Sequence, residues 1–138
     1  MPQFTIDAAM DAGLAYVEDS ATLFVLLNGE PATYAEANTV HAGVATDRRL
    51  ASVAVIGTDF TTAAGDVTGR KSTIAAKTHA GEHTAGGEVL ATYWALLNVT
   101  GTALLAYGPL QSSIGITNGV NQDTSAFDWW EIADPTAA

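Results

Sequence analysis

The order of hydrophobic and polar positions predicts a short helix followed by a strand near the N-terminus. In "IDAAMDAGLAYVEDS", Met10, Leu14 and Val17 recur at helical spacing, which places them on one face of a helix. We therefore expect a short amphipathic helix over about residues 7–19. The next segment, "ATLFVLLNGEP", is an apolar run rich in strand-forming residues that ends in an Asn-Gly turn, and it predicts a buried strand.

A second, shorter helix is expected after Pro31. Thr33 stands three residues before Glu36, which is the spacing of a capping box, in which the two side chains bind free backbone amides of the first helical turn. One or two helical turns are therefore predicted to follow Pro31.

Strand-like segments, separated by clusters of Gly, Thr and Asp, occupy most of the chain from Leu50 onward. The candidates are "LASVAVIG", "RKSTIAAKT", "EVLATYWALLN", "TALLAYGPL", "SSIGIT" and "AFDWWEI". The connection from Val99 to Gly101 is short enough for a hairpin loop. This regular succession of strand-like segments and turns predicts a mainly β fold, an antiparallel β-sandwich or barrel with a short N-terminal helix. No repeat or linker divides the 138 residues, so we expect one β-rich domain over 1–138, with its strands mainly within 50–132.

Both faces of one predicted strand are apolar. Because successive side chains of a strand point to opposite faces, "EVLATYWALLN" directs Tyr93 to one side and Trp94 to the other, each among aliphatic residues. Such a strand belongs at the centre of a sheet that is covered on both sides, by the rest of the chain or by a neighbour. In "FDWWEI" the same alternation sends the two Trp side chains to opposite faces.

Composition and charge narrow the function classes. The formal net charge is −10 and the five basic residues form no extended stripe, so direct binding to nucleic acid or to an anionic membrane is not expected. The absence of cysteine excludes disulfides, thiolate metal sites and cysteine nucleophiles. The N-terminus lacks a signal-peptide pattern and no stretch approaches the ~20 apolar residues of a membrane helix. We expect a soluble protein made in the cytoplasm, with a charge-poor surface of the kind that other subunits cover.

One segment has the residue spacing of a metal site. In "THAGEHTAGG", His79, Glu82 and His83 follow the H-x-x-E-H order of one class of zinc hydrolase. Those enzymes carry the motif on a helix, where both His side chains share one face. Here Gly81 lies inside the motif and further glycines follow it between two strand patterns, which favours a hairpin loop with two solvent-exposed His. No metal site is predicted.

Other catalytic patterns are missing from the sequence. There is no G-x-S-x-G elbow, no Gly-rich phosphate-binding loop and no dinucleotide-binding fingerprint. Asn118, Asn121 and Asp123 could offer oxygen ligands to calcium, but their segment fits no EF-hand loop and is assigned to turns. We therefore predict neither enzymatic activity nor a cofactor.

The candidates for an interaction site are aromatic and basic residues, namely Trp129, Trp130, Tyr93, Arg48 and Arg49. Trp is frequent among residues whose truncation weakens a protein contact by about 2 kcal/mol or more. One Trp of the pair could instead fill the core, and core packing is the expected role of Tyr93. On so acidic a chain, Arg48 and Arg49 are candidates for contacts with carboxylates of a neighbouring subunit, although a local salt bridge is the simpler explanation.

Several segments, taken in their order along the chain, resemble a known class of protein. The series "LAYVEDSATLFVLLNGEPATYAEA", "GRKSTIAA", "ATYWALLN" with "ALLAYGPL", and "AFDWWEIADP" resembles small structural proteins of tailed bacteriophages. The resemblance runs from about Leu14 to Pro135. It implies a virion component built mainly of β-structure and without enzymatic activity, and it assigns no role to any single residue.

The leading functional expectation is a capsid decoration, or cement, protein. Such a protein would bind the major capsid protein lattice, associate with copies of itself and reside on the capsid surface of the virion. It would stabilise the shell by binding only its assembled form. The alternative is a tail or baseplate component, including a host-surface module whose exposed aromatic residues stack on sugars. An enzyme acting through His79 and His83 ranks third.

Overall fold

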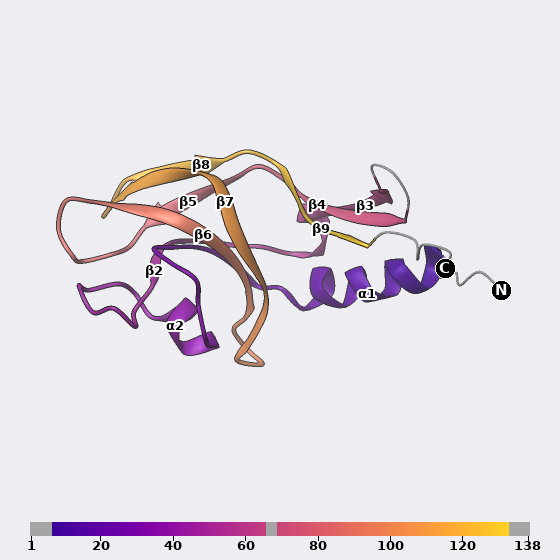
Figure 1. Ribbon diagram of the computed structural model, residues 1–138, viewed down its shortest axis with the longest axis horizontal. Coiled ribbons are helices and arrows are strands. Elements are labelled where there is room, and N and C mark those ends of the chain that lie inside the picture. Colours follow the sequence, from indigo (N-terminus) through magenta and orange to yellow (C-terminus); the bar gives the residue numbers. More distant parts are fainter. Residues whose placement is uncertain (1–6, 66–68, 133–138) are drawn as a thin grey trace, which may run out of the picture.

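Two antiparallel sheets and an N-terminal helix make up the chain (Figure 1). The structure, a computed structural model, describes residues 7–65 and 69–132. The elements in chain order are α1 (Asp7–Ser20), β1 (Leu23–Leu27), α2 (Tyr34–Asn38), β2 (Arg49–Ala54), the 3₁₀ helix η1 (Gly57–Asp59), β3 (Phe60–Ala64), β4 (Arg70–Ile74), β5 (Lys77–Gly81), β6 (Glu88–Asn98), β7 (Ala103–Thr117), β8 (Asn121–Thr124) and β9 (Phe127–Ile132). The expected fold class, mainly β with a short N-terminal helix, is confirmed. Among the residues described, no helix is long and apolar enough to cross a membrane.

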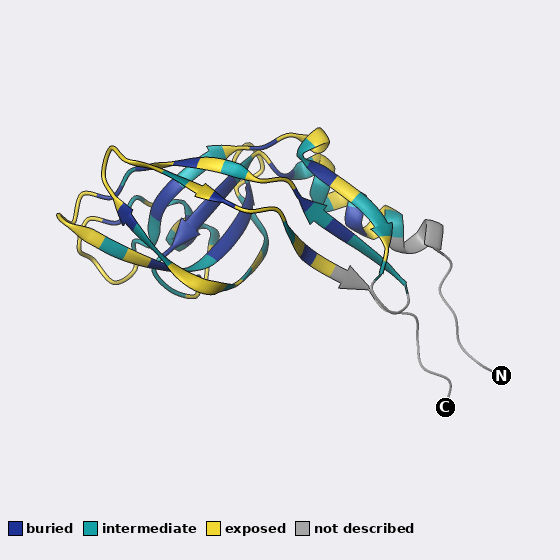
Figure 2. Cartoon of the chain, turned by 90° about the horizontal axis from the view of Figure 1, so that it is seen from above, coloured by how far each residue is buried: buried dark blue, intermediate teal, exposed yellow. Residues whose placement is uncertain are grey.

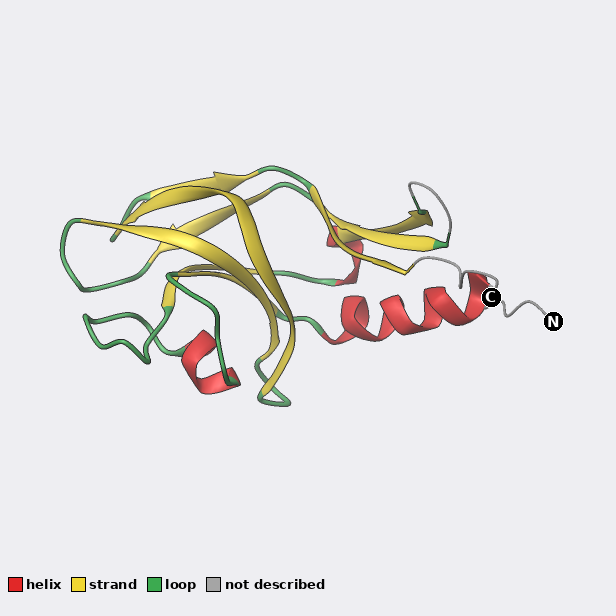
Figure 3. Cartoon of the chain, in the orientation of Figure 1, coloured by secondary structure: helices red, strands yellow, loops and turns green. Residues whose placement is uncertain are grey.

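The larger sheet has six strands in the order β7-β6-β1-β2-β5-β8 and curls into half of a barrel (Figure 3). The smaller sheet has three strands in the order β3-β4-β9. It lies at one end of the molecule beside α1, and together they form a narrower extension of the half-barrel (Figures 1 and 2). β9 follows β8 closely in the sequence, so the C-terminal part of the chain links the two sheets.

The main hydrophobic cluster runs through both sheets. It includes Leu14 of α1, Phe24 of β1, Ile74 of β4 and Trp129 of β9, none of which is more than 6% exposed. Figure 2 shows buried residues inside the half-barrel and continuing toward α1. A second, smaller cluster lies where α2 covers β1 and β6, beneath Ala37.

Strand β6 is covered on both faces, as its sequence predicts. Trp94 and Leu96 belong to the main cluster, whereas Ala95 and Leu97 belong to the cluster under α2, with Tyr93 packed against it. Residues of the same chain cover both faces. The two apolar faces of β6 are therefore buried by intramolecular packing.

Local helix and turn signals act as the sequence predicts. α1 covers the expected helical segment. Thr33 caps α2 by accepting a hydrogen bond from the Glu36 amide at 3.2 Å, and the Glu36 carboxylate accepts one from the Ala32 amide at 2.9 Å. The bond from Ala32, helped by the side chain of Arg48, lowers the pKa of Glu36. Residues 99–102 connect β6 to β7 as a hairpin.

Three of the predicted strands have the wrong boundaries. "RKSTIAAKT" is not one strand, because β4 and β5 lie in different sheets and the chain crosses between them at Ala75 and Ala76. Conversely, "TALLAYGPL" and "SSIGIT" belong to the single strand β7. The pairing of β7 with β6 jumps from Pro109 to Ile114, so the predicted break marks a bulge within a strand and not the end of one.

Strands β3 and β8 are not predicted by the sequence. β3 consists largely of Thr and Ala, and β8 is the polar segment "NQDT", which is typical of turns. β8 forms a strand because it pairs with β5, across which the Thr78 hydroxyl donates a hydrogen bond to Asp123 at 2.6 Å. The assignment of Asn121 and Asp123 to turns is therefore wrong.

Candidate functional site

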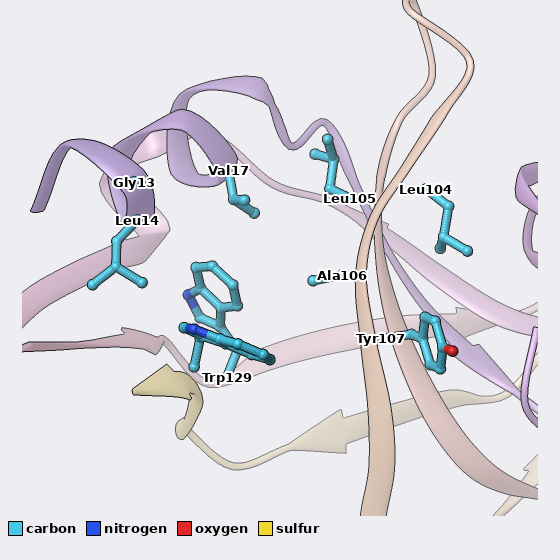
Figure 4. A pocket seen from close by; sticks show the side chains of 9 residues that line it. Gly13, Leu14, Val17, Leu104, Leu105, Ala106, Tyr107 and Trp129 are labelled. Atoms are coloured by element: carbon cyan, nitrogen blue, oxygen red, sulfur yellow. The ribbon is translucent and has the colours of Figure 1, made fainter. Parts of the chain in front are cut away.

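The paired indoles of β9 lie on one side of the small sheet. Trp130 is opposite Ser72 of β4, and the next pair joins Asp128 to Thr73, so Trp129 is an extra residue in the ladder. A β-bulge of this kind breaks the alternation of side chains. As a result both indoles line the same groove, in which Figure 4 labels Trp129, and the predicted placement on opposite faces is wrong.

Trp129 forms the inner wall of this groove and is fixed by hydrogen bonds. Its ring packs edge-on against Phe60, with centroids 6.4 Å apart. Its indole N–H donates to the Ser72 hydroxyl at 2.6 Å, and that hydroxyl donates to the Glu18 carboxylate of α1 at 2.6 Å. The Thr62 hydroxyl donates to the same carboxylate at 2.8 Å. This network ties α1 to the small sheet, so Trp129 has a structural role.

The groove lies between α1, the beginning of β7 and β9, and its volume is about 600 Å³. This volume falls within the range of ligand-binding pockets. On the α1 side, Gly13 contributes no side chain, while Leu14 and Val17 form the wall (Figure 4). Residues 104–107 of β7 close the groove on another side. Its surface is consequently mostly aliphatic and aromatic.

Trp130 is the most exposed aromatic residue of this groove, with 56% of its surface accessible against 42% for Tyr107. Tyr107 lines the groove from β7, and its hydroxyl donates a hydrogen bond to Glu30 at 3.1 Å, which raises the pKa of Tyr107. β9 is an end strand of the small sheet, so within the described chain its outer edge has no strand partner. An exposed indole beside an apolar groove can contact both aliphatic and cationic side chains of a partner.

The other residues predicted to contact partners do not line the groove. Tyr93 is half-buried against the cluster under α2. Arg48 pairs with Glu36 at 3.2 Å, and Arg49 lies 2.9 Å from Glu82 in an ion pair that lacks hydrogen-bond alignment. The structure thus brings Trp129 and Trp130 together and separates them from Tyr93 and the two Arg residues.

All five basic residues form ion pairs with carboxylates of the same chain. The pairs are Arg48–Glu36, Arg49–Glu82, Arg70–Asp11, Lys71–Asp128 and Lys77–Asp59, with N–O distances of 2.7 to 3.2 Å. The sequence has 15 acidic residues against these five, so the chain keeps a large excess of negative charge. Complementarity favours a partner that brings Lys or Arg to the contact.

Both histidines of the H-x-x-E-H segment are buried, and the prediction of a loop with two exposed His is wrong. His79 lies in β5 and His83 follows that strand, and both side chains are completely inaccessible. His83 Nε2 lies 2.6 Å from the Ile116 carbonyl oxygen, so this nitrogen carries the proton. Glu82 instead lies beside Arg49. Within residues 7–65 and 69–132, no group of three or more His, Asp or Glu is arranged to hold a metal ion.

Most of the groove was not identified from the sequence. Residues 104–107 carry no motif, and they line the groove with α1 and β9 only because the fold brings these distant segments of the chain together. One local signal was present. Gly13 interrupts a predicted helix, where glycine is unfavourable by about 1 kcal/mol relative to alanine, and such a residue often indicates a packing or functional requirement.

No protein-family model, curated protein or solved structure matches the chain.

Proposed function

We propose that the chain is a capsid decoration protein of a tailed bacteriophage and binds the major capsid protein lattice through the groove beside Trp130. The observation that carries the proposal is the exposure of this indole in an apolar groove, on the open edge of β9. Exposed aromatic residues next to apolar concavities are typical of protein contacts. The phage assignment itself depends on the resemblance to small virion proteins.

The net negative charge of the chain supports a partner that carries basic side chains at the contact. An aliphatic side chain of the lattice would fill the groove, and a Lys or Arg of the lattice would lie over the face of Trp130. The chain cannot supply this cation, because its own five basic residues are already paired with carboxylates. The excess of negative charge would also accelerate association with a basic surface.

The mechanism would be stabilisation of the shell by linkage. A protein that binds the assembled lattice but not its free subunits stabilises each site by about 2.7 kcal/mol when its free concentration is 100 times the Kd. Repetition over the lattice would multiply this effect. The hydrogen bonds that fix Trp129 would keep one wall of the groove rigid, and a rigid wall loses little conformational entropy on binding.

The substitution Trp130→Ala tests the proposal. Removing an interface indole typically lowers the binding free energy by about 2 kcal/mol, about 30-fold in Kd, while the fold should persist because this side chain is 56% exposed. Binding is measured by co-sedimentation with capsids assembled from the major capsid protein, and the effect on the shell by the temperature at which the capsids open.

The matched control is Tyr16→Ala. Tyr16 is a 69% exposed aromatic residue of α1 that does not line the groove, so its removal should leave capsid binding unchanged. Equal losses in the two variants, or failure of the unaltered protein to bind capsids, would contradict the proposal.

A second candidate is a tail or baseplate component that binds sugars on the host surface. The rings of Trp130 and Tyr107 line one groove, and aromatic faces of this kind can stack on sugar rings. Gold-labelled protein bound at the tail, with binding to host cells but not to capsids, would favour this candidate over capsid decoration.

A further inference from the structure

The hairpin formed by β7 and β8 is splayed open. The two strands are consecutive and are joined by residues 118–120, yet they are the two end strands of the six-stranded sheet and do not pair with each other. Their turn is bound to β5 instead. The Gly119 amide donates to the Gly81 carbonyl at 3.0 Å, and the Gly81 amide donates to the Val120 carbonyl at 3.1 Å. β8 therefore follows β5, and the half-barrel stays open along β7.

An opening of about 760 Å³ separates residues 109–114 of β7 from residues 123–128 at the end of β8 and the start of β9. We call this opening the seam. Its apolar lining includes Trp94 and Phe127, whose ring centroids lie 5.4 Å apart. Polar side chains and carboxylates form the rest of its lining. The seam thus has one apolar side and a polar rim.

The backbone on both sides of the seam lacks regular strand partners. On β7, the pairing with β6 passes over residues 110–113. On the other side, Ser125 and Ala126 lie between β8 and β9 and belong to no strand. Backbone N–H and C=O groups at such positions require water or another polar partner. An added strand supplies donors and acceptors at the spacing that these groups need, so an extended peptide is the ligand that fits this opening.

The charge of the rim indicates which side chains that peptide carries. Asp123 and Asp128 both line the seam. Asp128 is paired with Lys71 at 3.1 Å, whereas Asp123 accepts a hydrogen bond from the Thr78 hydroxyl and, within the described chain, forms no ion pair. A Lys or Arg of the incoming strand would complement Asp123.

We propose that the seam binds an extended segment of a different protein, which adds a strand between β7 and the β8–β9 connection. Alternate apolar side chains of this segment face Trp94 and Phe127, and a basic side chain lies at Asp123. A second copy of the chain is a poor donor, because each copy carries a net charge of −10 and all five of its basic residues are already in ion pairs. The seam shares no lining residue with the groove beside Trp130.

Fluorine NMR of the full chain labelled with 5-fluorotryptophan tests this proposal. The chain has three Trp, so the spectrum contains three signals that single Trp→Phe variants assign.

The probe is a blocked hexapeptide, about 20 Å long when extended, in which valine alternates with threonine and lysine. A second peptide replaces lysine with glutamate. A third keeps the lysines but carries N-methyl groups on the amides of one edge, so it cannot pair as a strand on that edge.

The lysine peptide should shift the Trp94 signal in a saturable manner and leave the Trp129 and Trp130 signals in place. The glutamate and N-methylated peptides should each bind about tenfold more weakly, since each loses the equivalent of one or two ordinary polar interactions. Shifts confined to the Trp129 and Trp130 signals, equal binding by the three peptides, or no shift at all would overturn the proposal. Peptide binding at the seam is measured without capsids. A protein that binds capsids but not the peptides would contradict only the seam proposal, and one that binds the peptides but not capsids would contradict only the proposed decoration function.

Substitution of Asp123 at the rim of the seam tests the proposal in a second way. Asp123→Asn keeps an oxygen that can accept the Thr78 hydrogen bond, so the strand pairing should persist. It should weaken binding of the lysine peptide about two- to fivefold, the effect of an exposed ion pair. Asp19→Asn, at an exposed carboxylate on α1 outside the seam, is the control and should have no effect. Equal affinities in the two variants would contradict the proposed role of Asp123.

Discussion

His79 shows that a titratable side chain can serve as an aromatic core residue. Its ring is fully buried and meets Phe24 edge-on, with centroids 4.5 Å apart. Burial, and to a smaller extent the charge of Lys77, lowers the pKa of His79 to about 4. The backbone of the cross-strand neighbour Gln122 opposes this shift weakly, but neither ring nitrogen has a hydrogen bond within the described chain. The folded protein therefore holds this imidazole in its neutral form at neutral pH.

Acidification should destabilise the fold through His79. Between the ordinary pKa of 6.5 and the folded value of about 4, the unfolded chain binds a proton that the folded chain excludes, so the free energy of unfolding falls as the pH decreases. The loss in the free energy of unfolding amounts to about 3 kcal/mol at the lower end of this pH range. Urea unfolding of the protein and of His79→Leu, repeated across the same pH range, measures this loss. The variant should lack this part of the pH dependence, and an equal pH dependence of stability in the two proteins would contradict the prediction.

At the scale of elements, β5 determines where the barrel opens. A Cβ atom on Gly81 would overlap the Thr117 carbonyl oxygen and lie 2.9 Å from that of Val120. Glycine therefore allows the β7–β8 turn to approach β5 closely and to exchange backbone hydrogen bonds with it. This attachment directs β8 toward β5 and away from β7.

The substitution Gly81→Ala should consequently destabilise the protein by about 3 kcal/mol, because the clash is with backbone and cannot be relieved by a rotamer change. Thermal unfolding measures the effect. Gly13→Ala is the control, since no atom lies within 4 Å of a Cβ placed there, and alanine should stabilise the helix by up to about 1 kcal/mol. Full stability of the Gly81 variant would show that the turn does not approach β5 in this way.

At the scale of the whole molecule, aromatic rings join the two sheets. Phe127 begins β9, and its ring centroid lies 6.0 Å from that of Phe24 and 5.4 Å from that of Trp94, both of which belong to the larger sheet. The chain has no cysteine, so no disulfide restrains the smaller sheet. Its attachment to the half-barrel depends on packing and on the chain connections.

The substitution Phe127→Ala should therefore loosen the smaller sheet selectively. We expect a loss of about 3 kcal/mol in stability, the lower end of the range for removing a core Phe, and amide hydrogen exchange that increases more in β3 and β4 than in β1 and β6. Leu90→Ala, at a 53% exposed position of β6, should change stability by less than about 0.5 kcal/mol. An equal increase in exchange across both sheets would show that Phe127 does not join them.

Elements with strong local signals were predictable from the sequence. The helical spacing in α1, the Thr33 cap of α2 and the two apolar faces of β6 each depend on neighbours a few residues away, and the structure confirms all three. The candidate site was predictable in part. An adjacent Trp pair indicated an interface candidate near the C-terminus, but not which indole is exposed, since a bulge in the pairing with β4 places both in one groove.

The sequence by itself determined the β class, the helix at the start and the acidic surface, because propensity, periodicity and charge are properties of short segments or of composition. Tertiary structure alone decided that His79 and His83 are buried, that β4 and β5 belong to different sheets and that β8 leaves β7. The physical reason is that burial and strand pairing are contacts between residues far apart in the chain, so they depend on how closely backbones can approach at positions such as Gly81.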